Sequence, residues 1–421
     1  MRRLLLLAAL SAVACGARAP KEETMAHLRE RVFSLAQIQT VYMDSLLMTK
    51  MPGQAGHDGT ANVMAGPDRP SREWLCPRTF QGDTLVTSDI GWWTSGFYPG
   101  VLWEIFKETG DERFRNLAIK HTRPLAGLLD RETDHDIGFQ LMGSYGKWWV
   151  SDAATLYNYD VLPLDEIKDV LDKGVKKLAG RFLPETGVIR SWNGARWNFP
   201  VIIDNMMNLE LLMFYGRDRD REIAEKHALT TMKNHFRDDG TCFHLVDYAD
   251  DGSILGKQTV QGYADDTAWA RGQAWALYGY AMMAQEEKTR NQDLWETFYG
   301  VAAKLESWLL ANLPEDGIPY WDFSQSDYKD ASAGAIIACG LLELHGLRGY
   351  LDDDPALAMA ERILRTLASP EYLAEPRTNG GFLLKHGVGN LPGHSEVDVP
   401  LTYADYYFLE ALTLYPSRLH P

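Results

Sequence analysis

The sequence has few cysteines and no excess of positive charge. Only 4 of its 421 residues are cysteine, and Cys76, Cys242 and Cys339 lie far apart, without the short spacing of a zinc or redox site. We expect these three to be buried thiols, since a chain of this size does not need disulfides to stabilise its fold. The net charge of -16 and the lack of a basic cluster exclude an extended basic face, so no nucleic-acid partner is expected.

The apolar run at the N-terminus is short. Residues 4–13 of "MRRLLLLAALSAVACGARAP" follow a basic start and cannot span a bilayer, which predicts a secretory signal over residues 1–19. "SAVAC" resembles a bacterial lipobox, which would make Cys15 the lipidated first residue of the mature chain; cleavage after Ala19 is the alternative. We therefore expect an exported protein of a Gram-negative bacterium, either periplasmic or anchored to the membrane as a lipoprotein.

Helical periodicity dominates the rest of the chain. Apolar residues recur at helical spacing in stretches such as 167–178 and 294–308. Start and stop signals predict about a dozen helices. They begin near Met25, Gly96, Glu112, Val150, Asp165, Asp204, Arg219, Thr267, Asn291, Asp330, Asp353 and Thr402. The pattern predicts a mainly α protein, as one large domain or two smaller ones, with six helical hairpins that either close into an (α/α)6 toroid or form an open solenoid.

Alternation typical of strands is rare, and loops rich in Gly, Pro and aromatic residues interrupt the helices. Short strands are predicted within 241–248 and 380–384. The irregular stretches are 53–96, 181–200 and 375–398. Loops of this length commonly carry function, and in a toroid they would gather at the mouth of the central cavity.

The segment "ETDHDIGFQ" places a histidine between two aspartates, just before an apolar patch. Consecutive residues point in different directions, which disfavours a metal site built from Asp134, His135 and Asp136. Two interpretations remain open. The aspartates cap or solvate a turn, or one of them takes part in acid–base chemistry with a second carboxylate.

A second carboxylate, Asp204, lies in an apolar setting in "NFPVIIDNMMNLELLMFYG". If Asp204 only caps the helix that follows, its pKa would be lowered. If it is buried near another carboxylate, its pKa would be raised and part of it would stay protonated at neutral pH, as a general acid requires. Both interpretations are compatible with the sequence.

The segment "TVQGYADDTAWARGQAWALYG" supplies a cation beside aromatic residues. Asp266 or Thr267 would cap a helix on which Arg271 and Trp275 stand four apart on one face. Such a pair fits a carboxylated sugar ring, with the guanidinium on the carboxylate and the indole on the apolar face, although a surface cation–π pair is the alternative. The chain has 13 tryptophans, many outside the helical stripes, which suits either carbohydrate stacking or core packing.

Several long motifs, in one order, resemble those of the unsaturated glucuronyl hydrolases, glycoside hydrolase family 88. They are "WWTSGFYPGVLWEIFKETGD", "DHDIGF", "PVIIDNMMNLELL", "QGYADDTAWARGQAWALYG", "DASAGAIIACGLLEL" and "DYYFLEAL". The resemblance implies a single all-α, (α/α)6 catalytic domain over residues 21–421. Such enzymes act after polysaccharide lyases, on oligosaccharides whose terminal uronic acid carries a 4,5 double bond. It implies protonation at C4 and addition of water at C5, after which the hemiketal opens and releases the rest of the chain. We expect no cofactor and no metal.

The resemblance also assigns roles to individual residues. Asp204 would be the general acid and base. Asp136 would be its partner, and would raise the pKa of Asp204. The residues expected to bind the substrate are Trp93, His135, Trp192, His244, Gln261, Trp269, Arg271, Trp275 and Ser395. Val260 stands where many members of the family have His, which bears on the preferred leaving sugar and its sulfation.

Two other functions are compatible with these residues. One is a hydrolase of the same fold that acts on unsaturated galacturonyl or rhamnogalacturonyl ends from pectin. The other is a non-catalytic glycan-binding lipoprotein, which the aromatic loops alone would allow. The two aspartates favour an enzyme, because a binding module does not need a buried acid.

Overall fold

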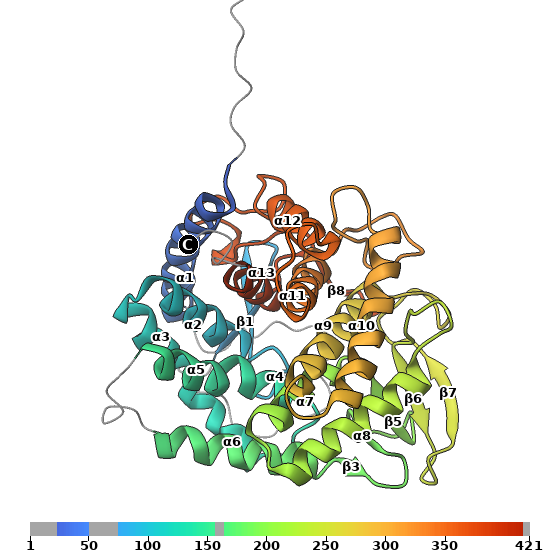
Figure 1. The fold of residues 1–421 in the computed structure, drawn as a ribbon. Coiled ribbons are helices and arrows are strands. Elements are labelled where there is room, and N and C mark those ends of the chain that lie inside the picture. The colour runs from blue at the N-terminus through green and yellow to red at the C-terminus, as the bar shows by residue number, and fades with distance from the viewer. Residues whose placement is uncertain (1–22, 50–74, 156–163, 416–421) are drawn as a thin grey trace, which may run out of the picture.

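The structure is a ring of paired helices (Figure 1). The computed structural model describes residues 23–49, 75–155 and 164–415. The outer helices are α1 (Met25–Thr49), α3 (Glu112–Thr122), α6 (Leu164–Ala179), α8 (Asp218–His235), α10 (Gln292–Asn312) and α12 (Pro355–Leu367). The inner helices are α2 (Phe97–Thr109), α4 (Ile137–Leu141) continued by α5 (Lys147–Thr155), α7 (Asn205–Tyr215), α9 (Ala270–Glu287), α11 (Ala331–Leu347) and α13 (Thr402–Leu414).

The ring is closed. Each inner helix contacts the next one along the chain, and the last, α13, contacts the first, α2. This arrangement confirms the predicted all-α, (α/α)6 toroid and excludes the open solenoid, in which the first and last helix pairs would stay apart.

Most predicted helix starts lie within two residues of the observed ones, and capping side chains mark those of α3, α10, α11 and α12. At the start of α12, for example, Asp354 Oδ1 accepts a hydrogen bond from the backbone N–H of Ala356 at 3.0 Å, and Pro355 occupies the first turn. Two predictions were less accurate. The helix predicted near Val150 already begins at Ile137 and passes through a π-helical turn, η3 (Met142–Gly146), and α9 begins after Thr267 because the backbone of Trp269 is extended.

The strands form small antiparallel sheets. The hairpins are β1–β2 (Cys76–Gln81, Thr84–Ser88), β3–β4 (Phe182–Leu183, Val188–Ile189) and β8–β9 (Gly387–Asn390, Ser395–Val399), and the three-stranded sheet is β5–β6–β7 (Phe199–Ile202, Leu245–Tyr248, Ile254–Gln258). The prediction for 241–248 is confirmed in its second half. The strand predicted at 380–384 is wrong. The N–H groups of Leu383 and Leu384 donate to the Asp405 carboxylate, each at 2.8 Å, and the segment forms only an isolated bridge, between Leu384 and Leu373.

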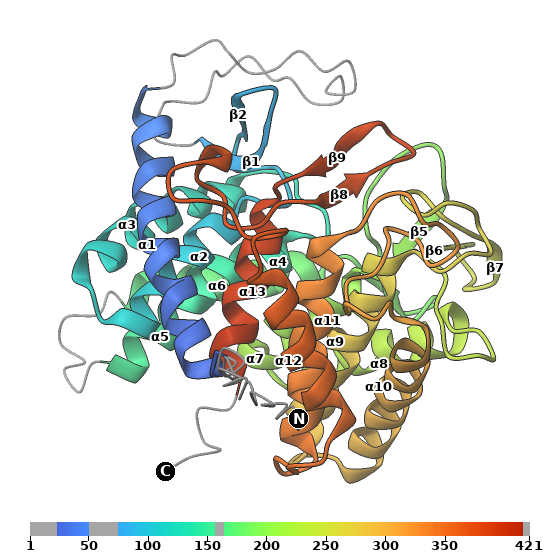
Figure 2. The same ribbon diagram turned by 90° about the horizontal axis from the view of Figure 1, so that it is seen from above.

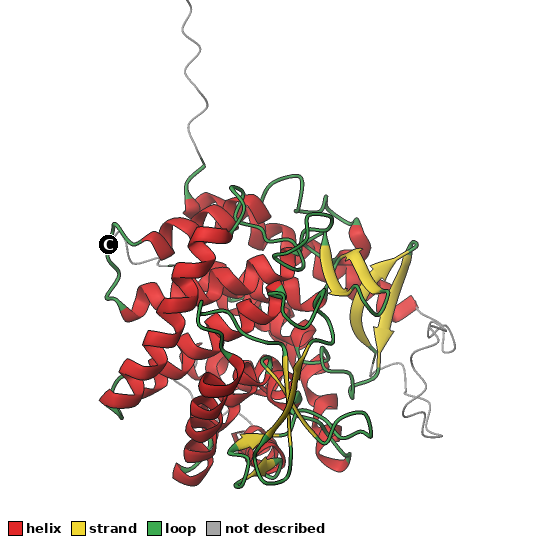
Figure 3. Cartoon of the chain, turned by 90° about the vertical axis from the view of Figure 1, so that its right-hand side faces the viewer, coloured by secondary structure: helices red, strands yellow, loops and turns green. Residues whose placement is uncertain are grey.

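The hairpins β1–β2 and β8–β9 lie together at one end of the ring, beside the starts of the inner helices (Figure 2). Figure 3 shows how little of the molecule is strand. Deeper in the ring, the partly buried Lys147 ammonium on α5 pairs with Glu104 on α2 and with Glu410 on α13, each at 2.7 Å. Because one cation pairs with two carboxylates, this contact ties three inner helices together at the level below the loops.

Small residues allow the inner helices to approach closely. A Cβ atom at Gly279 of α9 would lie 2.5 Å from Met206 of α7, so only glycine fits at this crossing. Cys76, Cys242 and Cys339 are buried thiols that form no disulfide with one another, as predicted. None of the helices in the described ranges has both the length and the apolar character that crossing a membrane requires. The proposed leader and Cys15 lie outside the described residues.

Candidate active site

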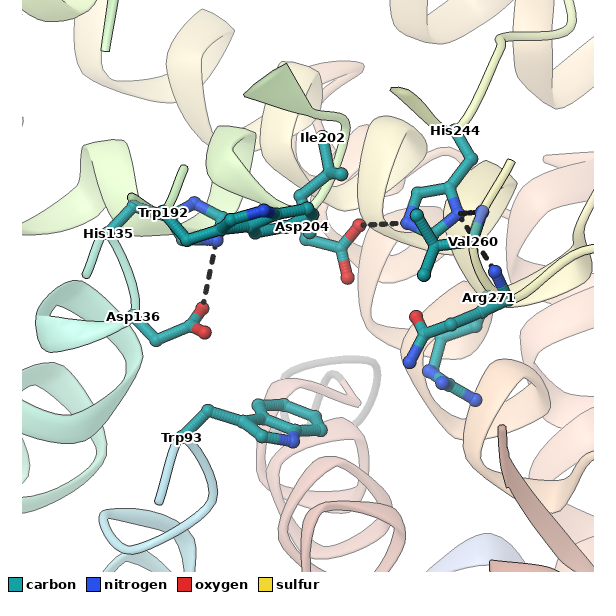
Figure 4. Close-up of a pocket in the computed structure, with 10 residues that line it drawn as sticks. Trp93, His135, Asp136, Trp192, Ile202, Asp204, His244, Val260 and Arg271 are labelled. Atoms are coloured by element: carbon teal, nitrogen blue, oxygen red, sulfur yellow. Dashed lines mark hydrogen bonds and ion pairs between the residues drawn. The ribbon is translucent and has the colours of Figure 1, made fainter. Parts of the chain in front are cut away.

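A cavity of about 160 Å³ lies at the end of the ring where the inner helices begin. Figure 4 shows the side chains that point into it. Its lining contains eight of the eleven predicted site residues together with two aliphatic residues: Trp93, His135, Asp136, Trp192, Asp204, His244, Gln261 and Arg271, with Ile202 and Val260. The sequence motifs, which are far apart along the chain, therefore meet at one site.

Helix starts position the charged groups of the cavity. Asp136 immediately precedes α4, Asp204 immediately precedes α7, and Arg271 lies in the first turn of α9. The N-terminal end of a helix carries unpaired N–H groups and a partial positive charge. A ring of such ends favours an anionic ligand in the cavity, although the protein as a whole is acidic.

Asp204 is buried, with 8% of its surface exposed. Although it directly precedes α7, its side chain makes no capping hydrogen bond, so the interpretation of this residue as a helix cap is wrong. Burial raises the pKa of Asp204 to about 7; the positive charge of Arg271 opposes this shift and the negative charge of Asp136 adds to it. A carboxyl group with this pKa exists at neutral pH as a mixture of acid and anion, which suits an acid that must also act as a base.

Asp134 and Asp136 have different roles. The carboxylate of Asp134 accepts a hydrogen bond from the backbone N–H of Asp136 at 2.9 Å, so the turn interpretation fits Asp134. The carboxyl of Asp136 makes no capping bond and faces the cavity, and burial raises its pKa to about 7. Within the described ranges, no three His, Cys, Asp or Glu side chains are grouped so that they could hold a metal ion.

Two histidines face the two carboxyls. His135 Nε2 lies 3.5 Å from Asp136 Oδ1, and His244 Nε2 lies 3.8 Å from Asp204 Oδ2. Burial lowers the pKa of His135 to about 4 and that of His244 to about 3, so both imidazoles are neutral at pH 7. His244 Nδ1 accepts hydrogen bonds from the backbone N–H groups of Val260 (3.1 Å) and Gln261 (3.3 Å), which places its proton on Nε2.

Several buried polar atoms at the cavity have no hydrogen-bond partner among the described residues. They include Asp204 Oδ2, His135 Nε2 and His244 Nε2. Leaving buried polar groups unpaired costs free energy, and such groups in a native protein generally have a role or an unseen partner. Three of them around one cavity indicate that it binds a polar ligand or ordered water.

Arg271 is buried, with 1% of its surface exposed, so it is not part of a surface cation–π pair. Its Nη1 donates to Asp330 Oδ2 at 3.2 Å and to the Val388 carbonyl, and its Nη2 donates to the Gly389 carbonyl. These bonds hold the β8–β9 hairpin over the cavity. Nε has no partner among the described residues, and Nη2 has a second hydrogen, so one edge of the guanidinium can still take a carboxylate.

Three predicted substrate-binding residues do not line the cavity. Trp275 is fully buried. Its ring centroid lies 5.0 Å from that of Phe139 and 5.2 Å from that of Tyr407, so it offers no face to a sugar, and the predicted role in substrate binding is wrong. Trp269 is outside the lining and packs on His244, with ring centroids 4.4 Å apart and the rings tilted by 32°. Ser395 begins β9 and is outside the lining.

Sequence reasoning missed two residues that support the site. Asp330, at the start of α11, caps that helix by accepting from the N–H of Ser332 at 3.0 Å, and its other carboxylate oxygen pairs with Arg271. The aspartate of the "DASAG" motif was interpreted only as a helix start. Tyr403 packs on Trp93, with centroids 4.8 Å apart, and no local pattern indicated that contact.

Comparisons with known proteins agree with this geometry. No protein-family model matches the chain. An unsaturated glucuronyl hydrolase from Formosa agariphila is 40% identical over 341 residues, which cover 76% of this chain and 79% of that protein. An unsaturated chondroitin disaccharide hydrolase from Streptococcus pneumoniae is 30% identical over 388 residues, which cover 88% of this chain and 93% of that protein.

Among solved structures, an unsaturated glucuronyl hydrolase specific for heparin matches with a TM-score of 0.78 and 36% identity, over 92% of this chain and 97% of that chain. Identity at this level over most of both chains, together with the closed helical ring, establishes the relationship. The chain belongs to the unsaturated glucuronyl hydrolases, a family of glycoside hydrolases.

Proposed function

We propose that this enzyme removes the terminal 4,5-unsaturated uronic acid from lyase-generated oligosaccharides of glycosaminoglycan type, by hydration of the double bond. The observation that carries the proposal is the Asp204 carboxyl, which is buried, has no hydrogen-bond partner on Oδ2 and has a pKa of about 7 because of burial. The names of the relatives, which act on unsaturated glucuronyl and chondroitin substrates, support the substrate class.

Asp204 acts first as an acid. Its protonated carboxyl donates a proton to C4 of the C4=C5 double bond, and the ring oxygen stabilises the cation that forms at C5. The Asp204 anion then takes a proton from water as the water oxygen bonds to C5, which restores the acid. In the resulting hemiketal the C5–O5 bond breaks to give a C5 ketone and a hydroxyl at C1. That hemiacetal opens to an aldehyde and releases the remaining sugar as a free alcohol.

The surrounding residues suit these steps. The free edge of Arg271 is available for the uronate carboxylate, which is conjugated with the double bond. His244 presents an Nε2–H group beside Asp204, in reach of a substrate oxygen or the attacking water. Trp93 and Trp192 supply aromatic surface on the cavity wall. Val260, beside His244, adds an aliphatic side chain to the wall, and this side chain offers no hydrogen bond to a leaving sugar (Figure 4).

The test of the proposal is a spectroscopic assay. Hydration destroys the conjugated double bond, so its ultraviolet absorbance decays. Purified enzyme is mixed with unsaturated disaccharides prepared from heparin, chondroitin, hyaluronan and pectin, with and without sulfate. Decay on the glucuronyl substrates supports the proposal. Decay only on pectin fragments would assign the galacturonyl activity instead, and no decay with retained glycan binding would indicate a binding protein.

Replacing Arg271 with alanine is expected to raise KM more than it lowers kcat, because the carboxylate grip is lost. The change also leaves buried Asp330 without its cation, at a cost of about 3–5 kcal/mol in the free energy of unfolding. Steady-state kinetics and thermal unfolding measure the two effects separately.

Arg78→Ala is the matched control for Arg271. Arg78 holds the same β8–β9 hairpin from outside the cavity, through a 2.9 Å ion pair with Glu396. If Arg78→Ala raised KM as much as Arg271→Ala did, the effect of Arg271 would come from the hairpin rather than from carboxylate binding.

We also propose, from the sequence of residues 1–19, that the enzyme is exported and anchored through a lipid on Cys15. Cys15→Ser is expected to move the protein from the membrane fraction to the soluble periplasmic fraction and to abolish labelling with radioactive fatty acid. Unchanged fractionation and no label on the unaltered protein would favour cleavage after Ala19 and soluble export.

A further inference from the structure

We propose that Asn208 is a positioning residue that keeps the single proton of His135 on Nε2, the ring atom beside Asp136 at the cavity. Asn208 lies on α7, is fully buried and does not line the cavity. It therefore does not touch the substrate, and it acts on the site through its hydrogen bonds with His135 and with the carboxyl of Asp136.

Hydrogen bonds fix the orientation of the Asn208 amide. Its Oδ1 accepts from the backbone N–H of Phe139 at 2.8 Å, at the first turn of α4. The amide nitrogen, Nδ2, therefore faces His135 Nδ1 at 3.3 Å. Because an amide nitrogen only donates, His135 Nδ1 must accept, and in a neutral imidazole the proton is then on Nε2.

Close packing prevents the amide from turning away. A Cβ atom at Gly138 would lie 2.5 Å from Asn208 Oδ1, so the α4 backbone is pressed against this side chain. Gly138 follows the "DHD" segment directly, and its lack of a side chain lets α4 and α7 meet here. The contact therefore couples the segment that carries His135 and Asp136 to the helix that Asp204 precedes.

His244 has the same proton arrangement by a different route. Its Nδ1 accepts from the main-chain N–H groups of Val260 and Gln261, so its proton is also on Nε2. Neither Nε2 atom has a hydrogen-bond partner among the described residues, and each lies near one of the two acidic carboxyls. The backbone fixes the proton at His244, whereas at His135 a side chain does so, and that side chain can be altered.

The charges around His135 do not fix its proton by themselves. Asp134 and Arg181 act on the ring in opposite senses, and a side-chain hydrogen bond with Asn205 raises the pKa of His135. His227, on the neighbouring α8, is a neutral buried imidazole. Burial keeps His135 neutral, so it carries one proton, and the donor on Nδ1 decides where that proton stands.

Asn208→Asp is the sharpest test, because it keeps the size of the side chain but reverses its hydrogen bonding. The new carboxylate still accepts from Phe139 N–H but can no longer donate, so His135 must place a proton on Nδ1. Nitrogen-15 NMR of the histidine rings, in the absence of substrate, is expected to show protonated Nδ1 at His135. His244 is the internal control and should keep its proton on Nε2.

The kinetic consequence rests on the proposed function. With an unsaturated disaccharide that the wild type hydrolyses, kcat/KM of Asn208→Asp is expected to fall about 10- to 100-fold per folded molecule. This is the effect expected from losing or misplacing one hydrogen bond to a charged group. Asn208→Ala removes the donor without supplying an acceptor, and should give a mixture of ring tautomers with a smaller fall. It carries the test if the aspartate variant does not fold.

The two readouts separate the possible failures. His135 protonated only on Nε2 in both variants would overturn the role of Asn208 whatever the change in kcat/KM, because Asn208→Asp also alters the hydrogen bond to Asp136. A wild-type enzyme that turns over none of the unsaturated substrates would overturn the proposed function, while the NMR result on the ring proton would still stand. A lowered unfolding temperature with unaltered ring protonation would show that Asn208 is only structural.

Discussion

Replacing Asp204 with asparagine is expected to lower kcat by about 10²- to 10⁴-fold, the range that general acid–base catalysis contributes. Asparagine keeps the shape of the side chain but can neither give a proton to C4 nor take one from water. KM should change little, because the carboxylate grip of Arg271 remains. The decay of ultraviolet absorbance measures the loss of turnover, and equilibrium binding of the unreacted substrate measures retained affinity.

The same substitution should not destabilise the protein at alkaline pH. The carboxyl of Asp204 has a pKa of about 7 when folded, because burial raises it from 3.8. The folded state therefore holds a proton that the unfolded state has released, and stability falls as pH rises through the window between these values. Asparagine does not ionise, so the unfolding temperature of Asp204→Asn at pH 8 should equal or exceed that of the wild type.

Asp405→Asn is the matched control. Asp405 is also buried, and burial likewise raises its pKa to about 7, but its carboxylate accepts two backbone N–H groups and does not line the cavity. This variant should lose stability and keep its turnover per folded molecule. A loss of turnover in Asp405→Asn equal to that in Asp204→Asn would mean that both substitutions act through the fold.

Local sequence patterns predicted the parts of the site that depend on burial. Asp204 follows a run of apolar residues, and the structure buries it with a raised pKa. Helical periodicity and capping residues located the start of α7 after Asp204, but not the start of α4 after Asp136. These signals are short-range, so a single segment is enough to show them.

Contacts between distant segments could not be predicted in the same way. The spacing of Arg271 and Trp275 placed both on one face of α9, but not which neighbour each would meet, and Trp275 turned out to pack in the core. Asn208 and His135 are 73 positions apart, and only the closed ring brings them together. The β1–β2 hairpin was missed because its strands are short and lie within a predicted loop.

Replacing Asp136 with asparagine is expected to slow catalysis and to shift the alkaline fall of kcat/KM to lower pH. Burial is the main cause of the raised pKa of Asp204, and the negative charge of Asp136 adds to it. Without that charge the pKa of Asp204 falls, so the proton donor is lost at a lower pH. The alkaline fall of kcat/KM should therefore occur at lower pH in Asp136→Asn than in the wild type, where two coupled carboxyls titrate.

A full pH–rate profile of both variants separates the roles of the two carboxyls. If Asp136 supports Asp204, Asp136→Asn keeps a measurable rate at acidic pH, where Asp204 is still protonated, while Asp204→Asn stays inactive at every pH. If Asp136 were itself the proton donor, Asp136→Asn would be the variant without activity at any pH, and the assignment of the two residues would have to be exchanged. If Asp136→Asn kept a residual rate and its kcat/KM fell at the same alkaline pH as in the wild type, the charge of Asp136 would have no effect on the pKa of Asp204.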